Sequence, residues 1–460
     1  MINQASKRNT IDGIVENVPM KIIDFRRPDY FNLRNDYRVK DAAKSAIDKY
    51  GSGNHLVPIF EDNPLFNNLQ RGLENVFNES GDNKEVAIFR GMDDAGESVM
   101  RLIPREAYII WERGGNGEIL RRPIYNLKNK YKIDFKRGNV EEYEKRLSEI
   151  PLNANVWCIL TGLNPEGTVT KLDKFLEIKN RRGAIGVIED GLGLFSFRQK
   201  GAIEYAGAQT KDCEFIIGGF DKALASNGAF IAYPKSLASK VVPKLNKLKY
   251  LTGLSYSDVA AASMALSIIS SEEGSIFRDN MKRTKSKIYF GIKDFFEITG
   301  EPESPLMKIL LKDESSTRLM YGYLANKGIL TYPYIRESVR SREDYGIRLA
   351  IHPLGDSEIS RVVGAIKDYP LFIKRLLSIS NRDELREVVM PERDTSIPDL
   401  AKMGDIEIEE LESSFKLARD LMVRQYPNPK IDLHARIFQQ HLPQKLPIIE
   451  KIKDLFEKID

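Results

Sequence analysis

The stretch CEFIIGGFDKALASNGAFIAYP, Cys213 to Pro234, decides the fold of this chain. Two short apolar runs, typical of buried strands, flank a glycine pair and the single lysine of the stretch, Lys222. Strands that are apolar on both faces occur in sheets covered by helices on each side, where ligands bind at the carboxyl ends of strands. A partly desolvated lysine at such an end can form a Schiff base with a carbonyl group. A lysine after a strand is otherwise an ordinary turn residue, so the rest of the sequence has to distinguish between these two interpretations.

Similar apolar runs recur upstream and alternate with helical patterns. Strands are predicted at residues 85–89, 107–111, 156–160, 184–188, 214–218 and 229–233. Apolar residues with helical spacing lie between them at 139–147 and 169–179. This order predicts an α/β fold with a mainly parallel sheet.

The pattern changes after residue 250, so the chain is predicted to contain more than one domain. Residues 257–271 and 279–296 are predicted helices that lead into a smaller region of mixed helix and strand signals. From residue 369 the chain is charged, helical in pattern and broken by prolines, which favours a packing or oligomerisation appendage. The predicted parts are an N-terminal arm (1–40), a large α/β domain (41–250), a small α+β domain (251–368) and a helical C-terminal extension (369–460).

Composition narrows the classes of partner and compartment. The 460 residues include 70 basic and 66 acidic side chains, so the net charge is only +4 and neither nucleic acid nor a membrane surface is expected as the main partner. Cys158 and Cys213 show no CxxC spacing, so neither a metal site nor a disulfide framework is expected. The sequence shows no signal-peptide pattern and no run long enough to span a membrane, which predicts a cytoplasmic protein.

Paired carboxylates follow another predicted strand. The run at 184–188 leads into Glu189 and Asp190. Carboxylates at a strand end can hold a protonated ring nitrogen, as in pyridoxal phosphate enzymes of the large α/β type, where the ring serves as an electron sink. They can equally cap the next helix or lie in a turn.

Two glycine-containing turns are candidates for binding a phosphate. Gly91 and Met92 lie in the segment FRGMDDAG, a predicted strand-to-helix turn whose backbone N–H groups can face an anion. The pair Gly218-Gly219 directly precedes the segment of Lys222. A glycine pair alone is a weak signal.

Two arginines downstream are candidates for binding a carboxylate, because the guanidinium group makes planar, bidentate hydrogen bonds. Arg336 lies in the segment YPYIRESV, and Arg348 lies in an otherwise apolar strand. A lone arginine is otherwise an ordinary surface ion-pair partner.

The order of these features resembles a known family. Residues 23–368, about three quarters of the chain, resemble the α-oxoamine synthases, which are fold-type-I pyridoxal phosphate enzymes with a seven-stranded sheet. The similar segments, in order, are residues 29–33, 43–54, 64–73, 161–172, 219–229 and 348–351.

The resemblance implies a role for each matching residue. Lys222 would form the Schiff base and move the substrate's α proton. Glu189 would hold the ring nitrogen, with Asp190 as a close competitor. Arg348 would hold the substrate carboxylate, assisted by a mobile Arg336.

The family shares its active site between two subunits, so the resemblance also implies a homodimer. Ser255 and Ser257 would contact the phosphate from the neighbouring subunit.

The sequence departs from the family around the cofactor. The ring-stacking histidine is absent from the segment WERGGNG, where Trp111 is a candidate replacement. A second histidine, near the ring hydroxyl, is also missing. Asp221 and Gly219 stand where the family has phosphate-binding hydroxyl residues, and a carboxylate there would repel the phosphate.

Three functions therefore remain open. The first is a pyridoxal phosphate-dependent acyltransferase that condenses an amino acid with an acyl thioester, on coenzyme A or an acyl-carrier protein, with loss of carbon dioxide. The second is a non-catalytic homologue that acts as a subunit or regulator of an active partner. The third is an aminotransferase or decarboxylase on the same fold.

Overall fold

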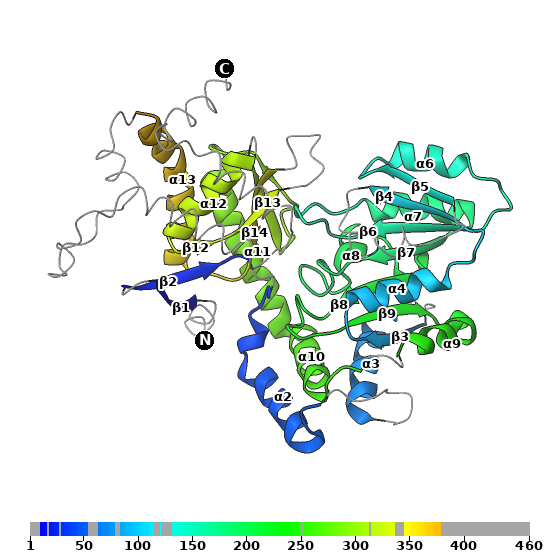
Figure 1. Cartoon of the computed structure of the whole chain (residues 1–460). Coiled ribbons are helices and arrows are strands. Elements are labelled where there is room, and N and C mark those ends of the chain that lie inside the picture. Colours follow the sequence, from blue (N-terminus) through cyan, green and yellow to red (C-terminus); the bar gives the residue numbers. More distant parts are fainter. Residues whose placement is uncertain are drawn as a thin grey trace, which may run out of the picture.

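A computed structural model gives the structure of most of the chain (Figure 1). It describes residues 10–15, 18–26, 29–53, 63–78, 83–113, 120, 131–249, 253–311, 314–335 and 345–378. Arg336 and the part of the predicted C-terminal extension from residue 379 onward lie outside the described residues.

A seven-stranded sheet forms the centre of the larger part. Its strands, in spatial order, are β3 (Lys84–Phe89), β9 (Ala229–Pro234), β8 (Phe215–Gly219), β7 (Ile185–Glu189), β6 (Val156–Thr161), β4 (Tyr108–Arg113) and β5 (Tyr131–Lys136). Only β9 runs antiparallel to its neighbours. All six predicted strands are present, so the predicted α/β class and mainly parallel sheet are confirmed. The seventh strand, β5, lies at an edge and has no continuous apolar run.

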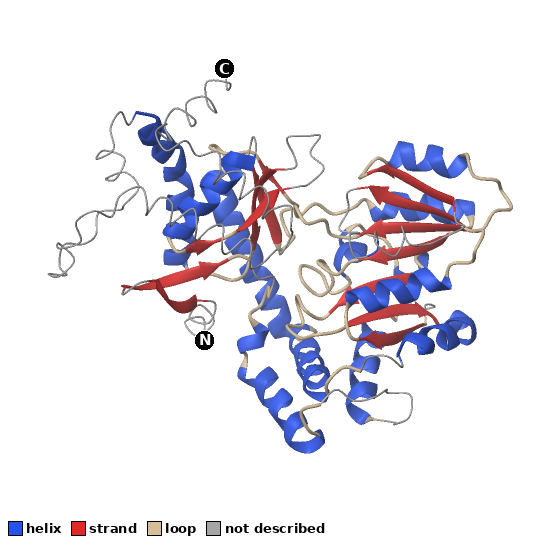
Figure 2. Cartoon of the chain, in the orientation of Figure 1, coloured by secondary structure: helices blue, strands red, loops and turns tan. Residues whose placement is uncertain are grey.

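Helices cover both faces of this sheet, as Figure 2 shows. On one face, α4 (Met92–Leu102) and α9 (Ala238–Lys249) enclose an apolar cluster with the strands. On the other face, α3 (Pro64–Phe77), α6 (Val140–Ser148) and α7 (Leu172–Arg182) contribute to a second cluster. The central strand β6 is consequently buried at every residue, which explains its unbroken apolar sequence.

Local hydrogen bonds fix the ends of the helices. Asn139 caps α6 by accepting from the Glu142 N–H, and Gly183 ends α7 at φ 68°. The helix predicted at 169–179 begins instead at Leu172, because Val169 bridges to Leu163 and the residues between them form a turn.

The smaller part contains a four-stranded antiparallel sheet. Its order is β10 (Ile298–Thr299), β11 (Leu306–Leu310), β14 (Tyr345–Ala350) and β13 (Tyr332–Ile335). The helices that accompany it are α11 (Glu272–Ile292), α12 (Glu314–Asn326) and α13 (Asp356–Ser378). Helix α10 (Tyr256–Ile269) packs beside α2 (Tyr37–Tyr50) and precedes α11.

The N-terminal strands lie with this smaller part. β1 (Thr10–Val15) pairs with β2 (Val18–Asp24), which pairs in parallel with β12 (Ile329–Leu330). After β2, the Phe25 carbonyl accepts a hydrogen bond from the Ala350 N–H at 3.0 Å, so the arm is joined directly to β14.

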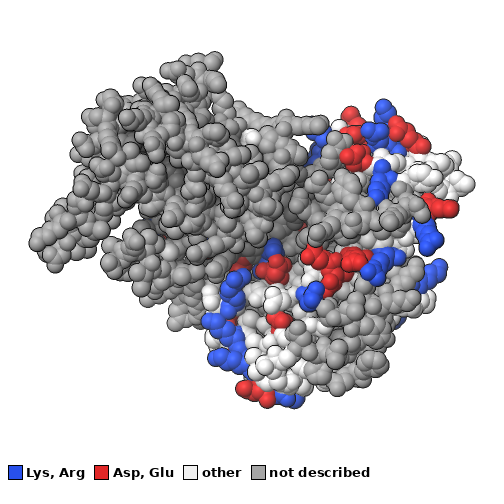
Figure 3. Space-filling model, viewed as in Figure 1, with Lys and Arg blue, Asp and Glu red and all other residues white. Residues whose placement is uncertain are grey.

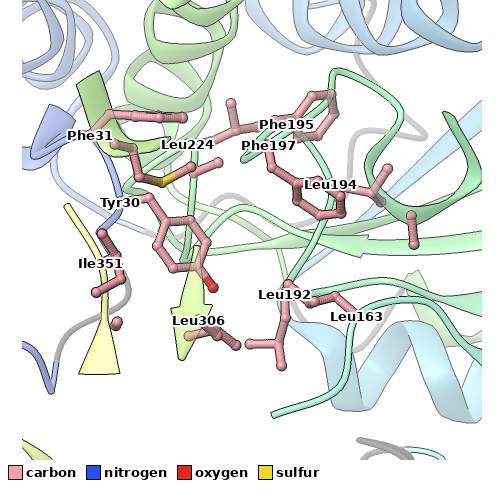
Figure 4. Close-up of a cluster of buried hydrophobic side chains, with 14 of the residues drawn as sticks. Tyr30, Phe31, Leu163, Leu192, Leu194, Phe195, Phe197, Leu224, Leu306 and Ile351 are labelled. Carbon is pink, nitrogen blue, oxygen red and sulfur yellow. The ribbon is translucent and has the colours of Figure 1, made fainter. Parts of the chain in front are cut away.

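Apolar side chains from all three parts meet next to the carboxyl ends of the large sheet. Figure 4 shows Tyr30 of the arm among Ile351 and Leu306 of the smaller part and Leu192 of the loop after β7. A close backbone approach accompanies this cluster: a Cβ on Gly167 would come within 2.1 Å of the Leu306 carbonyl oxygen. The small sheet therefore sits against the edge at which the predicted site residues emerge.

Charge is spread over the surface without a single dominant sign on the face in Figure 3, where basic and acidic side chains both occur in the described part. Among the described residues, no helix combines the length and the apolar character needed to cross a membrane. The same residues contain no group of three or more His, Cys, Asp and Glu that could hold a metal ion.

Candidate active site

The predicted site residues of the large sheet gather at its carboxyl edge. β7 ends at Glu189 and β8 ends at Gly219, while α4 begins at Met92 after its N-cap residue Gly91. The Met92 side chain touches both strand ends: a Cβ on Gly191 would lie 2.9 Å from Met92 Cε, and one on Gly219 would lie 3.2 Å from Met92 Cγ. The structure thus brings the first turn of α4 together with the ends of β7 and β8.

Glu189 is a fully buried carboxyl group at the centre of this edge. Its Oε1 accepts a hydrogen bond of 2.9 Å from the Gly191 N–H, while Oε2 is buried with no partner among the described residues. Burial raises the pKa of Glu189 to about 8; the neighbouring Asp190 adds to the rise and Lys222 opposes it. A carboxyl with a raised pKa and a free oxygen is suited to sharing a proton with a ligand nitrogen.

Asp190 points into the fold. Its Oδ1 accepts from the Leu163 N–H at 2.9 Å, and its Oδ2 accepts from the Ala202 N–H at 2.8 Å. A Cβ on Gly193 would lie 2.3 Å from Oδ1, so the loop wraps tightly around this carboxylate. Burial raises the pKa of Asp190 to about 7, against the lowering effect of the backbone N–H groups. Both oxygens are used in folding, and the predicted contact of Asp190 with a cofactor stays a prediction.

Lys222 lies in the turn after β8, in contact with the carboxylate of Asp221. Its side chain is 22% exposed and that of Asp221 is 49% exposed, so the pair lies at the boundary between protein and solvent. The turn is anchored by the buried ring of Phe220, whose N–H donates to the Gly228 carbonyl oxygen at 2.9 Å. The amine of Lys222 is therefore close enough to Glu189 to influence the pKa of that carboxyl group, and it also contacts the carboxylate of Asp221.

The region predicted to bind phosphate carries opposing electrostatic features. The N-terminus of α4 offers backbone N–H groups, and a Cβ on Gly91 would meet nothing within 4 Å, so the backbone there is open. The first turn also contains Asp93 and Asp94, the latter 3.3 Å from Arg90. With Asp221 included, three carboxylates lie near this edge, two of which pair with Arg90 and Lys222.

Arg348 lies in β14 of the small sheet. Its guanidinium carbon lies 3.9 Å from the centre of the Tyr332 ring, in a cation–π contact between neighbouring strands. Its Nε is buried with no hydrogen-bond partner in the part of the chain that the structure describes. The predicted carboxylate-binding arginine thus has a donor that no described residue uses.

Tyr30 is a residue of this region that sequence reasoning missed. Its ring is fully buried, and its hydroxyl has no partner among the described residues. Burial raises the pKa of Tyr30, while the nearby Arg348 lowers it. The residue lies in one of the segments that carry the family resemblance, 29–33, but that segment gave no sign that the hydroxyl would be left without a partner.

Trp111 lies in β4 and is almost fully buried. It belongs to the apolar cluster between the sheet and α4, together with Ile109 and Met100. Its predicted role as a replacement for the stacking histidine stays a prediction.

Ser255 is the N-cap residue of α10, and Ser257 lies in the first turn of this helix. The Ser255 hydroxyl accepts from the Asp258 N–H at 3.1 Å and lies 2.8 Å from the Ser257 hydroxyl. Asn227, in the turn that follows Lys222, donates to Asp258 Oδ1 at 3.0 Å. Within one chain Ser255 caps the helix and Ser257 contacts Ser255, and the contact of the two serines with a phosphate of a neighbouring subunit stays a prediction.

Curated proteins of similar sequence carry two names. The serine palmitoyltransferase of Bacteroides ovatus is 26% identical over 352 residues, covering 72% of this chain and 83% of that protein. The 8-amino-7-oxononanoate synthase of Thermosipho melanesiensis is 23% identical over 322 residues, covering 67% of this chain and 78% of that protein. No protein-family model matches the chain.

Solved structures of proteins with the same names share the fold. A serine palmitoyltransferase of Sphingomonas wittichii superposes with a TM-score of 0.69 at 18% identity, covering 76% of this chain and 87% of that one. The 8-amino-7-oxononanoate synthase of Francisella tularensis gives a TM-score of 0.63 at 17% identity, covering 76% and 98%. The predicted fold-type-I architecture is confirmed, and so is the chain's resemblance to the α-oxoamine synthases.

Proposed function

We propose that this protein is a pyridoxal phosphate-dependent acyltransferase that condenses an amino acid with an acyl thioester and releases carbon dioxide, giving an α-oxoamine. The observation that carries the proposal is the buried carboxyl of Glu189, whose Oε2 has no partner among the described residues and whose pKa is influenced by Lys222. Relatives named serine palmitoyltransferase, one of them solved with pyridoxal phosphate, support the same reaction class.

The described residues suit the ring of the cofactor better than its phosphate. The free oxygen of Glu189 suits a ring nitrogen, because a buried acceptor without a partner costs free energy until a ligand supplies one. Asp221 and the first-turn carboxylates of α4 do not suit a phosphate. The backbone N–H groups at Gly91 and Met92, and Ser255 and Ser257 of a second subunit, would have to outweigh these charges.

The proposal assigns a role to each of these residues. Pyridoxal phosphate, when bound, supplies an electron sink for the substrate's α carbon. Glu189 would share a proton with the ring nitrogen. Lys222 would hold the cofactor through its carbonyl group and would be the residue that moves the proton at the substrate's α carbon, while Arg348 would hold the substrate carboxylate. Arg336, outside the described residues, is proposed as a second arginine for that carboxylate.

The cofactor gives this proposal a direct test. Purified protein incubated with pyridoxal phosphate should turn yellow, and the visible absorption band should disappear in Lys222→Ala. Lys235→Ala, at a lysine near the end of β9, is the matched control and should keep the band. A protein that stays colourless at saturating pyridoxal phosphate contradicts the proposal.

The alternative of a non-catalytic subunit is favoured by one observation, the contact between Asp221 and Lys222. The acidic neighbour pairs with the amine and repels a phosphate, as expected in a site that no longer binds the cofactor. A colourless protein that forms a stable complex with an active relative would support this alternative.

The assembly and the acyl donor are part of the same proposal. We infer a homodimer with a shared site in the cytoplasm, an acyl group delivered on coenzyme A or a carrier protein, and no nucleic-acid partner. These points rest on the family resemblance and on the near-neutral charge of the chain.

A further inference from the structure

Two polar atoms on the small-domain side of the site are buried without partners. They are the hydroxyl oxygen of Tyr30 and Nε of Arg348, both without a hydrogen bond to any described residue. Buried polar groups are nearly always hydrogen-bonded, because an unpaired group loses its hydrogen bonds to water and gains none in the protein. Two such donors in one place indicate a shared ligand.

The two groups belong to one electrostatic environment. Among the charges that act on the Tyr30 hydroxyl, Arg348 has the largest effect, and Asp221 follows. The hydroxyl therefore lies within electrostatic reach of both the guanidinium group of Arg348 and the carboxylate of Asp221. It is a neutral donor next to a fixed cation.

The local fold holds both side chains in place. The Asp29 carboxylate accepts from the Leu33 N–H at 3.1 Å and from Arg34 Nε at 2.8 Å, which closes the turn that contains Tyr30. Figure 4 shows the ring packed beside Leu306 and Leu192. On the other side, the Tyr332 ring supports the guanidinium group at 3.9 Å.

Together they suit one end of a zwitterion. A phenol hydroxyl and a guanidinium group are both donors and bind a carboxylate through its two oxygens. The carboxylate of Asp221 also acts on the Tyr30 hydroxyl, so the same region holds a negative group for the positive amino group of such a ligand.

We propose that the Tyr30 hydroxyl donates a hydrogen bond to the substrate's carboxylate and forms, with Arg348, a two-point binding site for it. This inference rests on the proposed function, because it takes the ligand to be the amino acid of that reaction. It adds a substrate-binding residue from the N-terminal arm, so the arm takes part in substrate recognition.

The test measures amino-acid binding by Tyr30→Phe, loaded with pyridoxal phosphate, through the change in visible absorption. A panel of L-serine, glycine and L-alanine serves as the probe. The half-saturating concentration should rise about tenfold, the effect of losing one hydrogen bond to a charged group. Cofactor binding should stay unchanged and the unfolding temperature should not fall, since removing a buried hydroxyl without a partner among the described residues relieves its desolvation cost.

Two controls separate this role from packing. Tyr143→Phe removes an equally buried hydroxyl on α6, next to Cys158, and should leave amino-acid binding unchanged. Ethanolamine, which lacks the carboxylate, should bind equally to wild type and Tyr30→Phe. Equal serine affinity in Tyr30→Phe and Tyr143→Phe overturns this inference but leaves the proposed function standing. A wild-type protein that binds the cofactor but responds to no amino acid overturns the proposed function as well.

Discussion

Asp221 is the residue that most limits the proposed chemistry. Its carboxylate touches Lys222 and stands where a phosphate is expected. Replacing it in Asp221→Thr removes the repulsion and supplies a hydroxyl donor, so the dissociation constant for pyridoxal phosphate should fall about tenfold, a modest effect because the group is half exposed. Absorbance titration measures it, and Asp48→Thr, at an exposed position of α2, controls for the loss of one negative charge. Weaker cofactor binding by Asp221→Thr would mean that the carboxylate assists the site.

Glu189 gives a prediction about pH. Its pKa is raised from 4.5 to about 8, so the folded protein keeps a proton that the unfolded chain has lost at neutral pH. Glu189 binds more protons in the folded state between these values, so its contribution to the free energy of unfolding of the cofactor-free protein decreases as the pH rises from about 5 to about 8. Glu189→Gln, which cannot ionise, should lose this part of the pH dependence in denaturant titrations. Identical pH profiles would show that Glu189 is ionised in the folded protein.

At the scale of the loop between β7 and α8 (Gly201–Tyr205), Asp190 should matter for folding. Asp190→Ala leaves the N–H groups of Leu163 and Ala202 buried without an acceptor, at a cost of about 3 kcal/mol in the free energy of unfolding. Asp173→Ala, which removes an exposed carboxylate from the first turn of α7, should cost less than about 1 kcal/mol. Urea titration of both variants measures the difference, and equal losses would contradict this role.

The strands show which elements a sequence predicts well. β6 and β8 are buried on both faces, and their continuous apolar runs made them visible in the sequence. β5 lies at the sheet edge with most of its residues partly or fully exposed, so its alternating sequence gave no such run. Burial on both faces therefore explains why β6 and β8 were predicted, and the exposure of β5 explains why this strand was missed.

The site was harder to predict because its residues depend on contacts between distant segments. Glu189 and Asp190 are both carboxylates at a strand end, and only the loop that folds around Asp190 distinguishes them. Tyr30 and Arg348 are more than 300 residues apart in the chain, so their unpaired donors become a feature only after the arm joins β14. Lys222 was found because its signal is local.

The molecule as a whole is expected to work as a dimer. With a chain mass of 52.4 kDa, light scattering should give about twice that value, 2 × 52.4 kDa, or ~105 kDa. The family resemblance implies that Ser257 contacts the phosphate across the interface, whereas inside each chain Asn227 connects the N-terminus of α10 with the turn that follows Lys222. Ser257→Ala alone should therefore weaken pyridoxal phosphate binding about tenfold, the loss of one hydrogen bond to a charged group.

Mixing two defective chains decides whether the site is shared. In a mixed dimer of Lys222→Ala and Ser257→Ala, one site combines both defects, while the other combines an intact Lys222 with an intact Ser257 from the opposite chain. Co-refolded mixtures should therefore recover sites of wild-type cofactor affinity, up to one in each mixed dimer, which neither variant shows alone. If Ser257 serves the Lys222 of its own chain, every site keeps one defect and mixing recovers nothing. The recovered fraction should follow the binomial proportion of mixed dimers as the ratio of the two chains is varied, a dependence that a monomer would not show.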